Sequence, residues 1–173
     1  MFSEKGQSLI ELVVVIAVIV IVVGALVFST IASLRNAQLA KNQSQATKLA
    51  QEGIEKVRSM RDRGDLIGGA FQINSQPIDS WLDSDLWTQH IYGNCIPNCY
   101  FKFNVSSFTY LAAASSIPSS AEEPLSDGKF KRAIILSDDS VTYQSQKTVT
   151  VIVTWIDFSG SHESRLTTFL RKI

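Results

Sequence analysis

The sequence predicts an α+β fold in which one long N-terminal α-helix packs on a C-terminal antiparallel β-sheet head. Three observations predict it. An apolar run extends from Leu9 to Phe28, a helix-favouring stretch without proline continues to Arg61, and strand-like alternation dominates the last third of the chain. The 173 residues allow one domain of ordinary size beside the helix.

The apolar run is long enough to span a membrane, because roughly 20 helical residues cross a hydrocarbon core of about 30 Å. Its only charged residue is Glu11. An ionised carboxylate in such a helix costs on the order of 2 kcal/mol or more, and it marks a functional site whose partner must be positive.

The charged start of the chain differs from an ordinary secretory signal, in which the small-residue cleavage site follows the apolar stretch. Here Lys5 and Gly6 precede it. Cleavage after Gly6 would remove only MFSEKG and leave the apolar helix at a new N-terminus, Gln7. A carboxylate and an ammonium about 4 Å apart attract by roughly 4 kcal/mol at an effective dielectric near 20, whereas each alone in an apolar core is heavily penalised.

These residues resemble the prepilin signature of the type IV pilin and pseudopilin superfamily: a short charged leader ending in Lys-Gly, then a mature chain whose fifth residue is Glu within an apolar helix. The resemblance implies that a prepilin peptidase cuts between Gly6 and Gln7 and that the new amine of Gln7 is N-methylated. It also implies that Glu11 pairs with the Gln7 amine of a neighbouring subunit. The chain departs from the family pattern in starting its mature part with Gln7 rather than Phe, and in having no proline before Pro77.

The resemblance implies an organisation into a leader (1–6), a membrane and filament-core helix (7–30), its amphipathic continuation (31–62) and an α+β head (63–173). The implied partners are prepilin peptidase, other pilin subunits, an inner-membrane assembly platform and, before assembly, the membrane. The implied location is the cytoplasmic membrane, with the head outside, and then an extracellular pilus.

The helix beyond the apolar run carries an apolar stripe with helical spacing, formed by Leu49, Ala50, Gly53, Ile54, Val57 and Met60. A helix that is apolar on one face needs a cover, and the β-rich remainder is the only candidate within the chain. The glycines Gly64, Gly68 and Gly69 predict the end of the helix.

Strands are expected at 100–105, 108–112, 130–136, 147–156 and 165–171, from alternating and β-branched residues. The segment 72–98 reads as a loop with short elements, and its aromatic residues Trp81, Trp87 and Tyr92 are expected to pack that loop rather than to bind a ligand. The final hairpin, with its DFSGSHES turn, resembles the closing strands of minor pilins and type I pseudopilins. A minor pilin is therefore the favoured interpretation, and a pseudopilin of a type II secretion or competence system is the alternative.

The only two cysteines, Cys95 and Cys99, predict a local disulfide that pins a turn. The alternative, a zinc site, would need two further ligands, for which only His90 and His162 are available. We therefore expect no metal and no cofactor. Asp127, Asp138 and Asp139 lack the ligand spacing of an EF-hand loop.

The formal net charge is zero, so no bulk field favours nucleic acid, although basic clusters occur at 58–63 and 129–132. No nucleophile elbow, phosphate loop or HExxH motif is present, and the chain is expected not to be an enzyme. A different class of function remains, an uncleaved membrane-anchored binding module that uses the loop between Trp81 and Tyr100. A third reading, an anchored enzyme, would use His90 or His162.

Overall fold

The computed structural model describes residues 4–91, 95, 98–103, 107–125, 128–139 and 141–172, with side chains from Leu9 onward. The chain divides into two compact units, Met1–Asn42 and Gln43–Ile173. In its described residues the first unit is entirely helical, whereas the second contains the end of that helix and all the strands.

Helix α1 extends from Glu4 to Arg63. It forms over this length because its sequence contains no proline and, beyond the apolar run, is rich in Ala, Gln, Lys, Leu and Glu. It ends at Gly64, whose φ of 68° places it in the left-handed region. The amide of Gly64 donates to the Arg61 carbonyl and that of Asp65 to the Met60 carbonyl, both at 2.9 Å. This is a Schellman cap, so the predicted exit at Gly64 is confirmed.

The second unit contains a seven-stranded sheet with the order β1-β5-β4-β7-β8-β9, in which β6 also pairs with β7. Its strands are β1 (Leu66–Gly68), β4 (Asn98–Phe103), β5 (Ser107–Ala114), β6 (Glu123–Leu125), β7 (Phe130–Ser137), β8 (Gln146–Asp157) and β9 (Gly160–Arg171). All pairings are antiparallel except β1 with β5. The short elements are β2 (Gln72–Ile73), β3 (Gln76–Pro77), α2 (Ser84–Thr88) and the 3-10 turn η2 (Ser119–Ala121). The predicted α+β class is confirmed.

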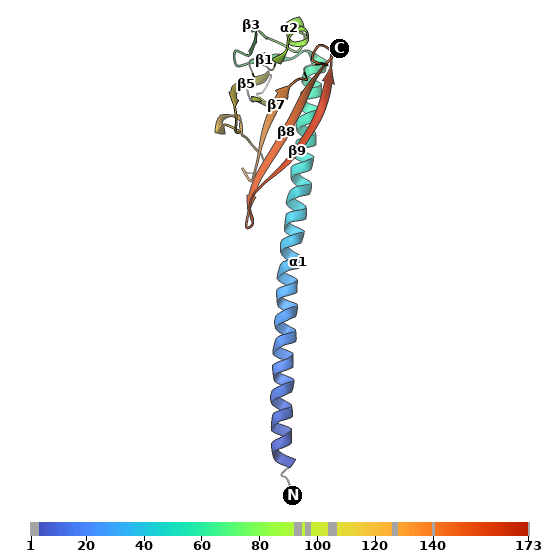
Figure 1. Cartoon of the computed structure of the whole chain (residues 1–173), viewed down its shortest axis with the longest axis vertical. Coiled ribbons are helices and arrows are strands. Elements are labelled where there is room, and N and C mark those ends of the chain that lie inside the picture. The colour runs from blue at the N-terminus through green and yellow to red at the C-terminus, as the bar shows by residue number, and fades with distance from the viewer. Residues whose placement is uncertain are drawn as a thin grey trace. The chain divides into compact units, whose positions relative to one another are not determined.

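The β8–β9 hairpin differs from the expectation in its turn. The strands pair from Asp157 with Gly160 onward, so β9 starts five residues earlier than the predicted 165. Two local features allow this early start. The Asp157 carboxylate accepts from the amide of Ser159 at 2.9 Å, and Gly160 adopts a φ of 122°. The turn is therefore confined to Phe158 and Ser159, and Figure 1 shows the resulting long pair of strands in red and orange.

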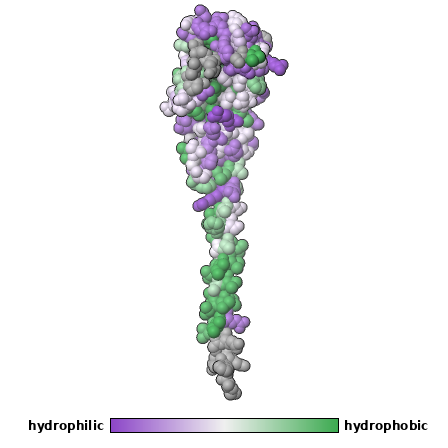
Figure 2. Space-filling model, viewed as in Figure 1, coloured by the Kyte–Doolittle hydropathy of each residue, from purple (hydrophilic) through white to green (hydrophobic). Residues whose placement is uncertain are grey.

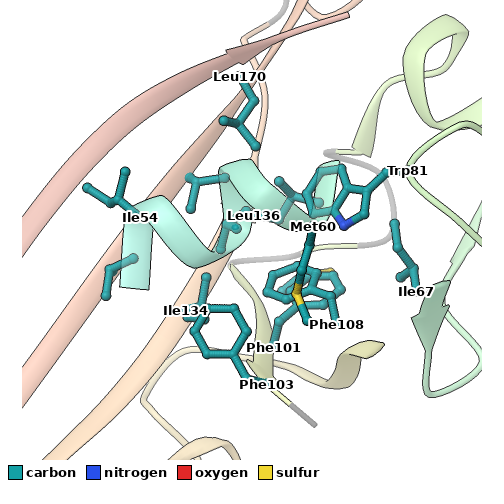
Figure 3. Packing of buried hydrophobic residues seen from close by; sticks show 14 of the residues in the cluster. Ile54, Met60, Ile67, Trp81, Phe101, Phe103, Phe108, Ile134, Leu136 and Leu170 are labelled. Atoms are coloured by element: carbon teal, nitrogen blue, oxygen red, sulfur yellow. The ribbon is translucent and has the colours of Figure 1, made fainter. Parts of the chain in front are cut away.

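The core of the second unit lies between the end of α1 and one face of the sheet. The predicted helical stripe is buried there: Ala50, Ile54, Val57 and Met60 are at most 8% exposed, and Leu49 packs against the same cluster. Figure 3 shows Ile54 and Met60 among side chains from β4, β5, β7 and β9. The opposite face of the sheet has a smaller cluster around Tyr100, Ile135 and Ile152, to which Ala121 of η2 contributes. The sheet thus covers the helix stripe, as predicted.

Gly53 lies where α1 packs tightly against side chains of the sheet. A Cβ atom there would lie 2.9 Å from Val151 Cγ1 and 3.1 Å from Arg132 Cδ. Gly53→Val should therefore lower the free energy of unfolding by about 1–3 kcal/mol, the usual cost of overpacking. Chemical denaturation of the full chain in detergent measures this cost. Gln51→Val, on the exposed side of the same helical turn, is the matched control, and equal losses in both variants would contradict a steric role for Gly53.

The two tryptophans of segment 72–98 are buried rather than displayed. Trp81 is 1% exposed and Trp87 3%, and Trp87 Nε1 donates to the Trp81 carbonyl at 2.9 Å. The preceding Asp83 caps α2 by accepting from the amide of Asp85. These aromatics pack the loop, as predicted; Tyr92 lies outside the described residues. The loop between Trp81 and Tyr100 therefore offers neither tryptophan as an exposed surface for a ligand.

Cys95 and Cys99 form a disulfide with a Cα–Cα distance of 4.7 Å. The predicted bridge is present, so the two sulfur atoms are not available as zinc thiolates. Both cysteines belong to the main hydrophobic core, at 4% and 0% exposure, and Cys99 is the second residue of β4.

Replacing both cysteines by serine should lower the free energy of unfolding by about 2 kcal/mol, the loop-closure entropy of so short a loop. Urea titration of wild type and variant under oxidising conditions measures the difference. Adding a reductant to the wild type is the internal control, and a double variant as stable as the oxidised wild type would contradict the expectation.

Candidate assembly site in helix α1

The first unit exposes an apolar helical surface that none of its described residues covers. From Leu9 to Val27 every Leu, Ile and Val side chain is at least 48% exposed, and Phe28 is 76% exposed. Figure 2 shows this described stretch as predominantly hydrophobic. Within the described residues, α1 is the one helix long and apolar enough to cross a membrane, with a mean hydropathy of 3.3 in its best window. An exposed apolar surface of this kind has to be covered by lipid or by other helices.

Glu11 is the only charged residue between Leu9 and Leu34, and it lies on the exposed surface of the helix. The described residues next to Glu11 in the sequence are apolar, so only the helical backbone determines where its side chain lies. The cation nearest along the chain on the C-terminal side is Arg35, 24 residues on. A carboxylate in this setting has to find a cation from outside the apolar stretch.

Gly6 and Gln7 lie within the helical backbone of α1, and their side chains are outside the described part of the structure. Gln7 and Glu11 are four positions apart in the sequence, which is just over one helical turn. Within one chain the two positions therefore share a face of the helix. Cleavage before Gln7 would create an amine one turn before the carboxylate.

His162 belongs to a small polar cluster at the β8–β9 turn. Its Nε2 lies 2.9 Å from both Ser159 Oγ and Asp157 Oδ1, and its ring stacks on Trp155 at 5.3 Å. A serine–histidine–carboxylate relay uses the two ring nitrogens for different partners, whereas here both contacts converge on the same nitrogen. The cluster therefore holds the turn, and its geometry gives no activated nucleophile.

Asp157 makes this turn sensitive to acid. Burial acts to raise its pKa, but the hydrogen bonds from the hydroxyl and amide of Ser159 and from His162 outweigh it and lower the pKa from 3.8 to about 2. Because the folded-state pKa is depressed, this stabilisation is present above the ordinary pKa and is lost as the pH falls toward about 2. Asp157→Asn should flatten the pH dependence of unfolding between 3.8 and about 2. Tryptophan fluorescence during acid titration tests this, and parallel curves for variant and wild type would contradict it.

The basic clusters seen in the sequence are largely paired with carboxylates. Arg58 contacts Glu55, Arg61 contacts Asp62 and Arg63 contacts Asp65, at 2.5–2.6 Å. In the second cluster Lys131 pairs with Glu122, and the buried Arg132 donates to Glu123 at 2.8 and 3.0 Å. These cations form ion pairs within the head and do not build a uniformly positive surface for nucleic acid.

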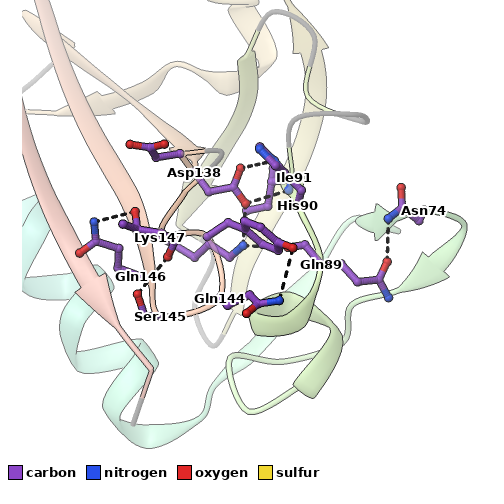
Figure 4. A network of polar contacts seen from close by, with 12 residues as sticks. Asn74, Gln89, His90, Ile91, Asp138, Gln144, Ser145, Gln146 and Lys147 are labelled. Carbon is purple, nitrogen blue, oxygen red and sulfur yellow. Dashed lines mark hydrogen bonds and ion pairs between the residues drawn. The ribbon is translucent and has the colours of Figure 1, made fainter.

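His90 contacts a buried ion pair that the sequence analysis did not identify. Its Nδ1 lies 2.6 Å from Asp138 Oδ1, and the other oxygen of Asp138 accepts from Lys147 Nζ at 2.6 Å (Figure 4). The Asp138 and Lys147 side chains are both 0% exposed. Asp127 lies outside the described residues, and among those described no cluster of three or more metal-ligating side chains occurs.

The comparison with protein-family models matched residues 1–27 to the prokaryotic N-terminal methylation motif. No curated protein and no solved structure matched the chain. The match covers the leader and most of the exposed apolar stretch, including Glu11, and it leaves the head outside.

The motif and the apolar N-terminal helix fit membrane anchoring of a protein with an α+β head. The motif is the class III leader of type IV pilins, and the long apolar helix fits it. The N-terminus of the chain is thus of the kind found in type IV pilins and pseudopilins. Such a leader points to a structural subunit rather than to an enzyme.

Proposed function

We propose that this chain is a filament subunit of the minor-pilin kind, processed by prepilin peptidase and assembled through its N-terminal helix. The observation that supports it most strongly is the single carboxylate, Glu11, within an exposed apolar helix whose start matches the methylation motif. The head then remains outside the cytoplasmic membrane before assembly and forms part of the pilus surface afterwards.

The proposed mechanism follows from charge and burial. Cleavage between Gly6 and Gln7 gives a new amine, which methylation leaves as a cation. In the membrane Glu11 is a costly isolated charge; in the filament core it is tolerated where it meets the Gln7 amine of a neighbouring subunit. Pairing them fixes the axial stagger between neighbouring helices, and packing of the aliphatic side chains holds the bundle.

The choice of a minor pilin rests on the C-terminal hairpin, β8 and β9, whose sequence resembles the closing strands of minor pilins and type I pseudopilins. A pseudopilin of a secretion or competence system has the same leader and helix. Abundance separates these subunits, because a major pilin dominates sheared filaments whereas a minor pilin is found there in traces, and a pseudopilin should stay with the cell envelope.

Mass spectrometry of the N-terminus in a sheared surface fraction tests the proposal. A chain that begins with methylated Gln7, and that retains MFSEKG in a strain lacking prepilin peptidase, is the expected result. A chain that keeps MFSEKG in normal cells would refute processing. It would favour the uncleaved binding module, although Trp81 and Trp87 of its candidate loop are buried.

A further inference from the structure

The end of β7 and the start of β8 carry a pair of reactive groups that filament assembly does not use. Lys147 Nζ donates to Asp138 Oδ2 at 2.6 Å and to the Gln89 carbonyl at 2.9 Å. The amide of Ile91 donates to the same carboxylate oxygen at 2.8 Å. Neither the lysine nor the aspartate side chain reaches solvent. An amine and a carboxyl group are therefore held in contact in a site without bulk water (Figure 4).

Such a dry site disfavours the separated charges. Burial lowers the pKa of Lys147, although the hydrogen bond and the charge of Asp138 act in the opposite direction. Transfer of one proton from the ammonium to the carboxylate removes both buried charges and leaves an amine beside a carboxylic acid. These are the two neutral forms that can condense, and the contact gives them a high effective concentration.

We propose that Lys147 and Asp138 form an intramolecular amide bond. The lone pair of Lys147 Nζ attacks Cγ of Asp138, and the N–C bond forms as one C–O bond breaks. The departing oxygen leaves as water with the carboxyl proton and one amine proton. The step needs no oxidant, reductant or co-reactant. The released water molecule diffuses out of the site into the bulk solvent.

His90 is placed to assist this step. Its Nδ1 lies 2.6 Å from Asp138 Oδ1, the oxygen that does not contact the lysine, and its side chain is 31% exposed. This oxygen accepts no hydrogen bond from the described residues, and a protonated His90 ring at this distance would stabilise, through its charge, the negative charge that develops on the oxygen during attack. The ring stacks on Tyr143 at 5.1 Å, which holds it in place.

The bond would close a loop across the turn between β7 and β8, and it would link that turn to the segment of Gln89 and Ile91 through the existing hydrogen bonds. Unlike the disulfide of Cys95 and Cys99, it survives reducing conditions. It therefore gives the head a second, redox-independent covalent constraint.

Intact-mass measurement of the full chain, purified in detergent and reduced, tests the proposal directly. The expected mass is smaller by one water molecule than that calculated from the observed N-terminus. In a tryptic digest the peptides 133–147 and 148–165 should appear as one species, 133–165, also lacking one water. A full calculated mass together with two separate peptides overturns the proposal.

Two variants control for position and one tests the role of His90. Lys147→Arg should restore the full mass, and Lys102→Arg, on the neighbouring strand β4, should still lose water. His90→Gln should lower the linked fraction at a fixed time after synthesis, and an unchanged fraction overturns the role given to His90. None of these results depends on cleavage at Gly6, so they are independent of the pilin assignment.

Discussion

Glu11→Ala should be cleaved by prepilin peptidase like the wild type but enter filaments at least roughly tenfold less. The physical reason is the Gln7 amine of the neighbouring subunit, which would be left unpaired in an apolar core. Removing one partner of a buried ion pair costs about 3–5 kcal/mol, and each 1.4 kcal/mol is about a factor of ten. The ratio of the variant in sheared filaments to that in membranes, measured by quantitative immunoblot, gives the effect.

The matched control is Leu12→Ala, which removes apolar area from the adjacent position without changing charge. It should enter filaments much more efficiently than Glu11→Ala. Normal incorporation of Glu11→Ala would refute the pairing model, and failure of both variants to be cleaved would show that the substitutions act on processing instead.

The sequence predicted those parts of the fold that depend on local periodicity. The helix, its exit at Gly64 and the stripe from Leu49 to Met60 follow from spacing and glycine content, and the structure has each of them. The early start of β9 was missed because it depends on a side chain, Asp157, bonding to the backbone of Ser159. The short strands β1, β2, β3 and β6 were missed because two or three residues are too few to show the alternation of apolar and polar side chains that indicates a strand.

The buried ion pair was not identified, although the sequence contained a signal for it. Lys147 shares the inward parity of Val149, Val151, Val153 and Trp155 along β8, so alternation alone places it on the core face. Arg132 occupies the same kind of position on β7. A cation at an inward position of a strand predicts a buried carboxylate nearby. Its identity, Asp138, depends on the turn between β7 and β8, which periodicity does not describe.

Lys147→Met should strongly destabilise the head, with an expected loss of about 3–5 kcal/mol, because it leaves the carboxyl group of Asp138 buried without its partner on Lys147. For a domain of this size such a loss lowers the thermal midpoint by roughly 10 °C or more. Calorimetry or thermal unfolding followed by circular dichroism measures it. Lys131→Met is the matched control, because Lys131 forms an ion pair with Glu122 at the surface, where such pairs contribute about 0–1 kcal/mol.

The double variant Lys147→Met, Asp138→Leu separates the two contributions of this site. Replacing a buried ion pair by apolar residues of similar size is often neutral or stabilising, so the double variant should recover most of what Lys147→Met loses through the unpaired charge. The part that it fails to recover includes the stabilisation by a covalent link between Lys147 and Asp138. A double variant less stable than Lys147→Met would mean that packing in this pocket, rather than charge, decides the stability of the head.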